Sequence, residues 1–226
     1  MNILDKKGVR FYADGTKEYI GVTSAIKLTQ GGDSLDVLMK WASNTPNYTE
    51  VQKGAMRFGT FMHGIAEDIL KGILCGYNIL YTKDDIDYLC YENDITYQPY
   101  DPFWAYETIY NYIQENVKEV ILIETKIKSD TLMLAGTVDS VLLMNNNNYT
   151  IVDFKFAKNP ASRRNYRLQL AIYKYMLEEE GYQIDDTFNL FPNPENKKQP
   201  YTISRGKDDI TREEVELVAR LAHLRI

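Results

Sequence analysis

The sequence predicts an α/β fold in which a central mixed β-sheet is flanked by helices and carries a helical insertion. Apolar residues recur at three- and four-residue spacing over residues 51–72 and again over residues 164–180, which is typical of amphipathic helices. Three consecutive segments between them have the composition of strands, at residues 119–127, 131–144 and 149–156. A short strand that ends at a proline follows at residues 186–192. This order of helices and strands indicates an α/β domain.

The length of the chain suits one domain with its own core, and we expect a single domain over residues 1–226. The core is expected over about residues 51–192. A helical insertion is expected within it, over about residues 80–118, and is broken by Pro99 and Pro102 because proline interrupts a helix.

The N-terminal residues 9–44 are expected to form a hairpin and two helices. Asp14-Gly15 is the turn signal of the hairpin. Thr23 or Ser24 is a candidate cap for the first helix, because a hydroxyl can accept a hydrogen bond from a free N–H of the first turn. The second helix is expected at about residues 34–43, before a proline.

The charge balance is acidic, with 26 Lys and Arg residues against 32 Asp and Glu residues and a net charge of -6. This balance argues against broad, sequence-blind coating of nucleic acid, which usually requires a basic domain. A local basic groove remains compatible with it, because net charge averages over the whole surface.

Cys75 and Cys90 are the only cysteines, too few for a cysteine-held zinc or iron–sulfur site. Two reduced thiols in a cytoplasmic protein are the plain interpretation. The N-terminus lacks the apolar segment of a signal peptide, and no apolar run reaches the length of a membrane span. We therefore expect a soluble, cytoplasmic protein without a membrane partner.

Charged residues interrupt the apolar strand at residues 149–156. Side chains alternate between the two faces of a strand, so Asp153 and Lys155 point the same way, while Phe154 points the other way. Burying a carboxylate and an ammonium is costly unless they are paired or used. A structural ion pair on an exposed sheet face is one interpretation, and a catalytic pair is the other.

Asp139 lies in the preceding strand, also among apolar residues. A hairpin centred on Asn146-Asn147 places Asp139 roughly level with Asp153. Neighbouring strands lie about 4.8 Å apart, so two facing carboxylates could share one divalent cation. Such a cation removes the repulsion that would otherwise force one acid to take up a proton. Lys155 beside it could orient an attacking water and offset charge on a phosphate.

Two helical pairs accompany these residues. His63 and Glu67 lie four residues apart, on one face of the first long helix, and Gln169 and Tyr173 have the same spacing on the later helix. Taken alone, a histidine such as His63 beside an apolar face is more often a satisfied core residue than a ligand, and a pair such as Gln169 and Tyr173 is more often a surface ridge. Neither pair indicates a functional site by itself; each does so only together with Asp139 and Asp153.

The combination resembles a known family. The chain contains, in order, G-T-x-x-H-x-x-x-E ending at Glu67, G-x-x-D ending at Asp139, D-x-K ending at Lys155, and Q-x-x-x-Y ending at Tyr173. This layout resembles that of RecB-type nucleases in the PD-(D/E)XK superfamily, over about residues 23–175 and with the insertion outside the match. The resemblance implies a restriction-endonuclease-like core and metal-dependent hydrolysis of DNA. The order of the four motifs, their spacing and their placement on helices and strands together are specific for this family, whereas no single motif is.

The resemblance implies roles for the site residues. Asp139 and Asp153 would be carboxylate metal ligands, with the main-chain carbonyl of Phe154 as a further ligand. Lys155 would be the catalytic lysine. His63 would be the extra ligand of the RecB-type branch, and an imidazole there favours Mn²⁺ over Mg²⁺.

Further roles follow from the same resemblance. Gln169 and Tyr173 would brace the site and touch the DNA strand. Glu124 could be an accessory acid near the metal. Glu67 could support a metal ligand, with a salt bridge as the alternative.

Hydroxyl and basic residues are candidate phosphate contacts. Thr23 and Ser24 resemble the N-terminal segment of phage-type members. Arg163, Arg164 and Arg167 precede Gln169 at a helix start, where they could hold backbone phosphates or form a solvated charged turn. The insertion offers aromatic residues that could stack on unpaired bases or pack in the core: Phe103, Trp104 and Tyr106.

The chain departs from the family pattern at two points. Val138 replaces the proline before the first aspartate, as is common in the RecB-type branch. The CRISPR-associated members of that branch use four cysteines for an iron–sulfur cluster, so a chain with two cannot hold one. The resemblance is therefore closer to phage-type and mitochondrial-type single-domain exonucleases. If the protein is encoded by a phage, we expect it in the cytoplasm of the host cell.

The expected function is a Mg²⁺- or Mn²⁺-dependent exonuclease on single-stranded DNA or DNA ends, in replication, recombination or repair. Exonuclease action is favoured because no separate recognition module is visible. A catalytically silent nucleic-acid-binding or scaffolding protein is one alternative, although it would have no reason to bury the two acids and the lysine. A nuclease acting on RNA or structured junctions shares every motif and is the other.

Overall fold

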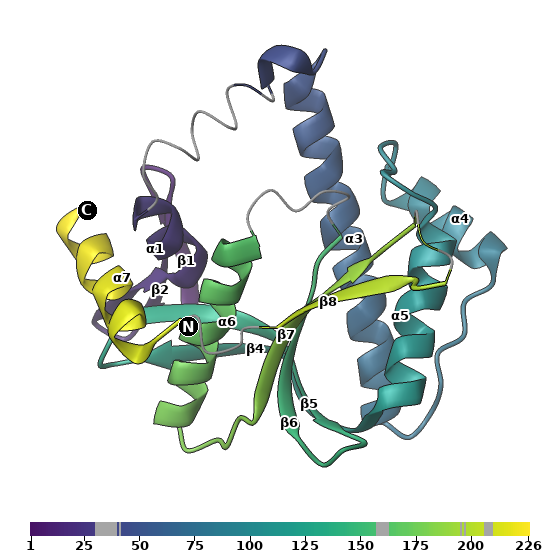
Figure 1. The fold of residues 1–226 in the computed structure, drawn as a ribbon. Coiled ribbons are helices and arrows are strands. Elements are labelled where there is room, and N and C mark those ends of the chain that lie inside the picture. The colour runs from purple at the N-terminus through teal and green to yellow at the C-terminus, as the bar shows by residue number, and fades with distance from the viewer. Residues whose placement is uncertain (30–39, 41, 157–162, 195, 197, 206–209) are drawn as a thin grey trace.

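The computed structural model describes residues 1–29, 40, 42–156, 163–194, 196, 198–205 and 210–226 (Figure 1). Its strands are β1 (Asn2–Lys6), β2 (Val9–Asp14), β3 (Lys17–Gly21), β4 (Val117–Ser129), β5 (Leu134–Met144), β6 (Tyr149–Phe154), β7 (Asp186–Pro192) and β8 (Tyr201–Arg205). Its helices are α1 (Val22–Thr29), α3 (Tyr48–Leu74), α4 (Lys83–Glu92), α5 (Pro102–Asn116), α6 (Arg163–Glu179) and α7 (Arg212–Leu224).

The strands form one mixed sheet in the order β1-β2-β3-β5-β6-β7-β8, with β4 paired to β5. Strand β6 lies between β5, to which it is antiparallel, and β7, to which it is parallel. The turn between β5 and β6 places Asn147 at a φ of 65°, a left-handed conformation that asparagine tolerates better than most residues. The asparagine-rich turn thus fixes how the two central strands align.

Apolar side chains pack on both faces of the sheet. On one face, Val152 and Phe154 join a buried cluster with α3, α4 and α5. On the other face, Val138 and Ile151 join a cluster with α1, α6 and α7. Figure 1 shows these two groups of helices on opposite sides of the sheet. The predicted mixed sheet flanked by helices is confirmed. Because side chains alternate along β6, Asp153 lies on the same face as Ile151, the face that α6 covers.

The insertion forms helices α4 and α5, which pack beside α3. Thr82 caps α4 in a capping box, in which its side chain and that of Asp85 each accept a backbone N–H. Pro102 begins α5, where its missing N–H costs nothing, and Asp101 accepts a hydrogen bond from the N–H of Phe103. The insertion is therefore helical, as its sequence predicts.

The N-terminal hairpin is confirmed, with Asp14 paired to Lys17 across the turn. The predicted cap is wrong, because α1 begins at Val22 and includes both Thr23 and Ser24. The Ser24 hydroxyl instead accepts a hydrogen bond from the N–H of Arg10 at 3.0 Å. The helix expected at residues 34–43 falls mostly outside the described residues.

Gly136 on β5 lies against the ring of Tyr173 on α6. A Cβ atom at Gly136 would approach Cε1 of Tyr173 to 2.7 Å. We expect Gly136→Ala to lower the free energy of unfolding, measured in urea, by about 1–3 kcal/mol, because the buried ring must move. Gly59→Ala is the control, since a Cβ there meets nothing within 4 Å, and it should raise stability by about 1 kcal/mol. Unchanged stability of Gly136→Ala would contradict this close packing.

None of the helices in the described part of the chain is both long enough and apolar enough to cross a membrane.

Candidate metal centre

Asp139 and Asp153 stand side by side in the β5–β6 hairpin. Ser140 pairs with Val152, and the same register continued by one residue sets Asp139 level with Asp153. The N–H of Phe154 donates a hydrogen bond to Oδ2 of Asp139 at 3.2 Å. Asp153 is only 1% exposed. The two acids thus converge on one point of the sheet, as the hairpin predicts.

Three side chains from three elements form a group of potential metal ligands: His63 of α3, Glu124 of β4 and Asp139 of β5. One ligand atom from each lies within 4.8 Å of the others. Nδ1 of His63 is 3.2 Å from Oδ2 of Asp139. One imidazole nitrogen and two carboxylates are a donor set that divalent cations such as Mn²⁺ accept.

Glu124 reaches this group through an irregular backbone conformation. In the β4–β5 register, Ile123 pairs with Ser140 and Thr125 with Val138, so Glu124 lies beside Asp139. Its φ of 42° lies in the left-handed region, which costs a residue with a side chain about 1–2 kcal/mol. Strained backbone that persists in a sheet is often found at functional sites. Glu124 was expected only as an accessory acid, and the structure places it in the central group.

Lys155 and Asp153 form a buried pair beside the three ligands. Nζ of Lys155 is 2.5 Å from Oδ2 of Asp153 and lies over the ring of Tyr166, 5.1 Å from its centroid. Apart from this ion pair at Oδ2, the oxygens of Asp153 have no hydrogen-bond partner among the described residues. A buried carboxylate oxygen that accepts no hydrogen bond lowers the stability of the fold. Oδ1, which has no partner, therefore fits a metal ion or a metal-bound water, and Oδ2 is held by Lys155.

The charges in the site shift the pKa values of the two central acids in opposite directions. Burial raises the pKa of Asp153 to about 6, with the Lys155 ammonium opposing and the Asp139 carboxylate assisting this effect. Burial also acts to raise the pKa of Asp139, but the hydrogen bond and charge of His63 outweigh it and lower that pKa. Asp139 is therefore the acid that is more readily ionised.

The surrounding groups respond to the same carboxylates. Burial acts to lower the pKa of His63 and of Lys155, but the neighbouring acids outweigh it and raise both. Glu124 is exposed as a residue, yet burial of its carboxyl group and the charge of Asp139 raise its pKa to about 7. Burial is the larger cause of both raised pKa values and the charge of Asp139 adds to it; a divalent cation would favour the ionised form of both acids.

The helical pairs lie around this centre. Glu67 forms a salt bridge with Lys71 at 2.8 Å, the alternative that the sequence left open. Nε2 of Gln169 donates a hydrogen bond to the hydroxyl of Tyr173 at 3.1 Å. Both residues of this second pair are buried, and the Tyr173 ring, which Gln169 holds through its hydroxyl, lies against Gly136 of β5.

The residues expected to contact phosphate differ in their exposure and in their ion pairing. The side chain of Arg163 lies outside the described residues, Arg164 forms an ion pair with Glu214 of α7, and Arg167 is partly buried on α6. Thr23 is exposed, whereas the neighbouring Ser24 is buried. The aromatic residues of the insertion pack against the α3–α5 cluster: Phe103, Trp104 and Tyr106.

Asn189 is a residue that the sequence gives no reason to select. It pairs with Asp153 in the parallel β6–β7 register, which places both side chains on the same face. It is fully buried, and neither its amide oxygen nor its amide nitrogen has a hydrogen-bond partner among the described residues. Such a group beside a metal site is a candidate for binding a coordinated water.

Comparisons with known proteins identify the family. A family model described as the PD-(D/E)XK nuclease superfamily matches residues 39–224, most of the chain. A search of curated proteins finds no match. One similar solved structure is described as the crystal structure of SSO0001, with 11% identity, coverage of 74% of this chain and 85% of that chain, and a TM-score of 0.32. That score is too low to support an argument. With the family model matching most of its length, the chain belongs to the PD-(D/E)XK nuclease superfamily.

Proposed function

We propose that the protein is a divalent-metal-dependent DNA nuclease of the RecB-type branch, acting as an exonuclease on single-stranded DNA or DNA ends in replication, recombination or repair. The observation that carries this proposal is the group of His63, Glu124 and Asp139 next to the buried pair of Asp153 and Lys155. A protein that only binds nucleic acid gains nothing from burying a carboxylate beside a second acid, with one of its oxygens left without a partner. Catalysis explains why this costly arrangement is kept.

The proposed roles follow from position. Asp139 and Glu124 are proposed to hold the cation with His63, and Asp153 is proposed to contribute Oδ1, which has no partner among the described residues. The main-chain carbonyl of Phe154 is proposed as a further ligand. When bound, Mg²⁺ or Mn²⁺ supplies positive charge that activates a water and stabilises the phosphorane-like transition state.

Lys155 is proposed to position the attacking water. Its ammonium contacts Asp153, and its raised pKa keeps it protonated. A protonated lysine can donate one hydrogen bond to the attacking water and another to a phosphate oxygen. In-line attack of the water breaks the P–O bond to the leaving sugar oxygen, which takes up a proton.

Residues outside the metal centre are proposed to guide the strand. Thr23 and the arginines at the start of α6, Arg164 and Arg167, would contact backbone phosphates. Arg163 is proposed to contact phosphates as well, because it directly precedes Arg164 in the sequence. Gln169 and Tyr173 were expected to touch DNA directly, and their burial instead favours a positioning role on β5.

A cleavage assay with labelled substrates tests the proposal. Single-stranded DNA, blunt and tailed duplexes and RNA, each with one labelled end, are incubated with Mn²⁺, Mg²⁺ or EDTA. We expect stepwise shortening of DNA from an end in Mn²⁺ or Mg²⁺, and none in EDTA. If no substrate is cut under any condition, a silent binding protein is the better account. Selective cutting of RNA or junctions would favour the other alternative.

Asn189→Leu tests the unsatisfied amide. Leucine has nearly the same shape without polar atoms, so we expect the free energy of unfolding to rise by about 1–3 kcal/mol. Cleavage should fall, because the amide shares a face with Asp153. Chemical denaturation and the cleavage assay measure the two effects. Lower stability of the variant would mean that the amide is bonded in the protein and would contradict this interpretation.

A further inference from the structure

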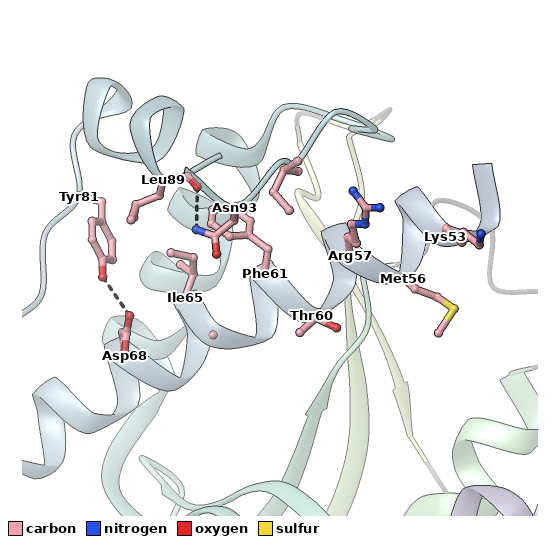
Figure 2. Close-up of a pocket in the computed structure, with 12 residues that line it drawn as sticks. Lys53, Met56, Arg57, Thr60, Phe61, Ile65, Asp68, Tyr81, Leu89 and Asn93 are labelled. Carbon is pink, nitrogen blue, oxygen red and sulfur yellow. Dashed lines mark hydrogen bonds between the residues drawn. The ribbon is translucent and has the colours of Figure 1, made fainter. Parts of the chain in front are cut away.

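An open pocket of about 690 Å³ lies between the first half of α3 and the insertion, and none of the proposed roles uses it (Figure 2). We call it the insertion pocket. Figure 2 shows Tyr81, Leu89 and Asn93 facing Phe61 and Ile65 of α3 at one end. Lys53, Met56, Arg57 and Thr60 continue along the same helix at the other end.

The insertion pocket has one edge on the turn of α3 that carries His63, although His63 itself does not line it. Thr60 and Gly64 both line the pocket. On a helix, Thr60 is a surface neighbour of His63 because residues three positions apart lie side by side, and Gly64 directly follows His63. A Cβ atom at Gly64 would meet nothing within 4 Å, so the pocket is open at the turn of α3 that carries His63. A strand that leaves the pocket past Thr60 would therefore run over the turn of α3 next to the metal centre.

One end of the insertion pocket is positively charged. Lys53 is exposed, and no ion pair joins it to any residue in the described part of the chain. Arg57 pairs with Asp94 at 2.5 Å, but both side chains are more than half exposed. An exposed ion pair contributes little and can exchange for a phosphate. In a chain with a net charge of -6, this local positive charge favours an anionic ligand.

The other end offers apolar and aromatic walls. Phe61, Ile65 and Leu89 line it, and the Tyr81 hydroxyl is held by Asp68 at 3.0 Å. Met56, near the charged end, leaves 67% of its surface exposed. Phosphate-binding cations beside apolar and aromatic surface are what an unpaired nucleotide requires, because its phosphate needs charge and its base needs a stacking surface.

We propose that the insertion pocket binds an unpaired nucleotide of a single strand, with its base against Phe61 and Leu89 and its phosphate at Lys53 and Arg57. The strand then continues past Thr60 toward the metal centre, where a phosphodiester farther along it would be cut. A base-paired nucleotide must first leave its duplex to enter, so the pocket selects frayed ends and single strands. This inference rests on the proposed nuclease function and specifies its substrate.

Binding of DNA without metal tests the pocket separately from cleavage. Fluorescence anisotropy in EDTA measures the affinity of the full chain for a fluorescein-labelled 12-nucleotide oligothymidylate and for a blunt duplex of the same length. Gly64→Leu fills the pocket at an open helical position, where leucine is a good helix former. Ala55→Leu is the matched control, because this exposed residue of α3 does not line the pocket.

We expect Gly64→Leu to weaken single-strand binding about tenfold or more, since stacking of a base is lost, while Ala55→Leu stays within about twofold of the wild type. Lys53→Glu, on the exposed surface, should weaken it as well and reduce its salt dependence. Lys7→Glu, in the turn between β1 and β2, is the charge control. Melting temperatures confirm that each variant folds.

Two results would overturn the proposal: no single-strand binding by the wild type, or wild-type affinity in both Gly64→Leu and Lys53→Glu. Cleavage in Mn²⁺ separates this failure from failure of the nuclease function. If Gly64→Leu and Lys53→Glu both bind and cut single strands as the wild type does, the pocket is wrong and the nuclease stands. If the wild type binds single strands through the pocket without cutting them, the nuclease is wrong and the pocket stands.

Discussion

Lys155→Met is expected to lower the free energy of unfolding of the metal-free protein by about 3–5 kcal/mol and to abolish cleavage. The ammonium of Lys155 is the nearest positive charge to the buried Asp153 carboxylate. Asp139, level with it on β5, adds a second negative charge. Without the lysine, these two acids face each other in a site that water reaches poorly. Methionine keeps much of the volume, so the effect reports charge rather than a cavity.

Chemical denaturation of Lys155→Met in EDTA measures this loss. Lys174→Met is the matched control: this lysine of α6 faces Glu178 at 3.7 Å on the surface, where a pair contributes about 0–1 kcal/mol. Adding Mn²⁺ should restore much of the lost stability, because the cation replaces the missing positive charge, by about 2.7 kcal/mol at a hundredfold excess over its Kd. A variant as stable as Lys174→Met would contradict a charged, buried pair.

Asp139→Asn is expected to reduce metal-dependent cleavage by at least about 10³-fold and to remove tight Mn²⁺ binding. The carboxylate of Asp139 contacts His63 and belongs to the proposed ligand group, so its charge matters more than its shape. Asparagine can still accept the hydrogen bond from the N–H of Phe154, and the hairpin should therefore fold.

Single-turnover cleavage and calorimetric titration with Mn²⁺ measure the effects of Asp139→Asn. Asp130→Asn serves as the control, because Asp130 is also an acid paired with a cation, Lys17, but lies in an exposed turn. We expect Asp130→Asn to cleave and bind metal like the wild type. Near-normal turnover by Asp139→Asn would show that the proposed ligand group does not perform the reaction.

The sequence predicted the parts of the fold and site that depend on local patterns. The strand at residues 186–192 agrees with β7, because apolar composition and a terminal proline define it locally. The facing of Asp139 and Asp153 followed from a short turn and the two-residue period of strands. The His63 position followed from helical spacing within a motif of fixed order.

Other parts depend on contacts that no local pattern reveals. Strand β1 is exposed along its whole length, so it has no apolar alternation to identify it. Glu124 joins the ligand group only because the β4 backbone adopts a positive φ, which its sequence does not indicate. The pairing of Arg164 with Glu214 depends on the packing of α7 beside α6, which neither segment indicates alone. Asn189 and the insertion pocket arise from packing between segments far apart in the chain.

The position of a bound cation tests the account most directly. Crystals soaked in Mn²⁺ would be measured at a wavelength where manganese scatters anomalously. The account predicts an anomalous peak within coordination distance, about 2.0–2.3 Å, of side-chain atoms of His63, Asp139 and Glu124, next to Asp153. Manganese bound elsewhere, or cleavage by a protein whose ligand group stays empty under the conditions of the assay, would contradict it.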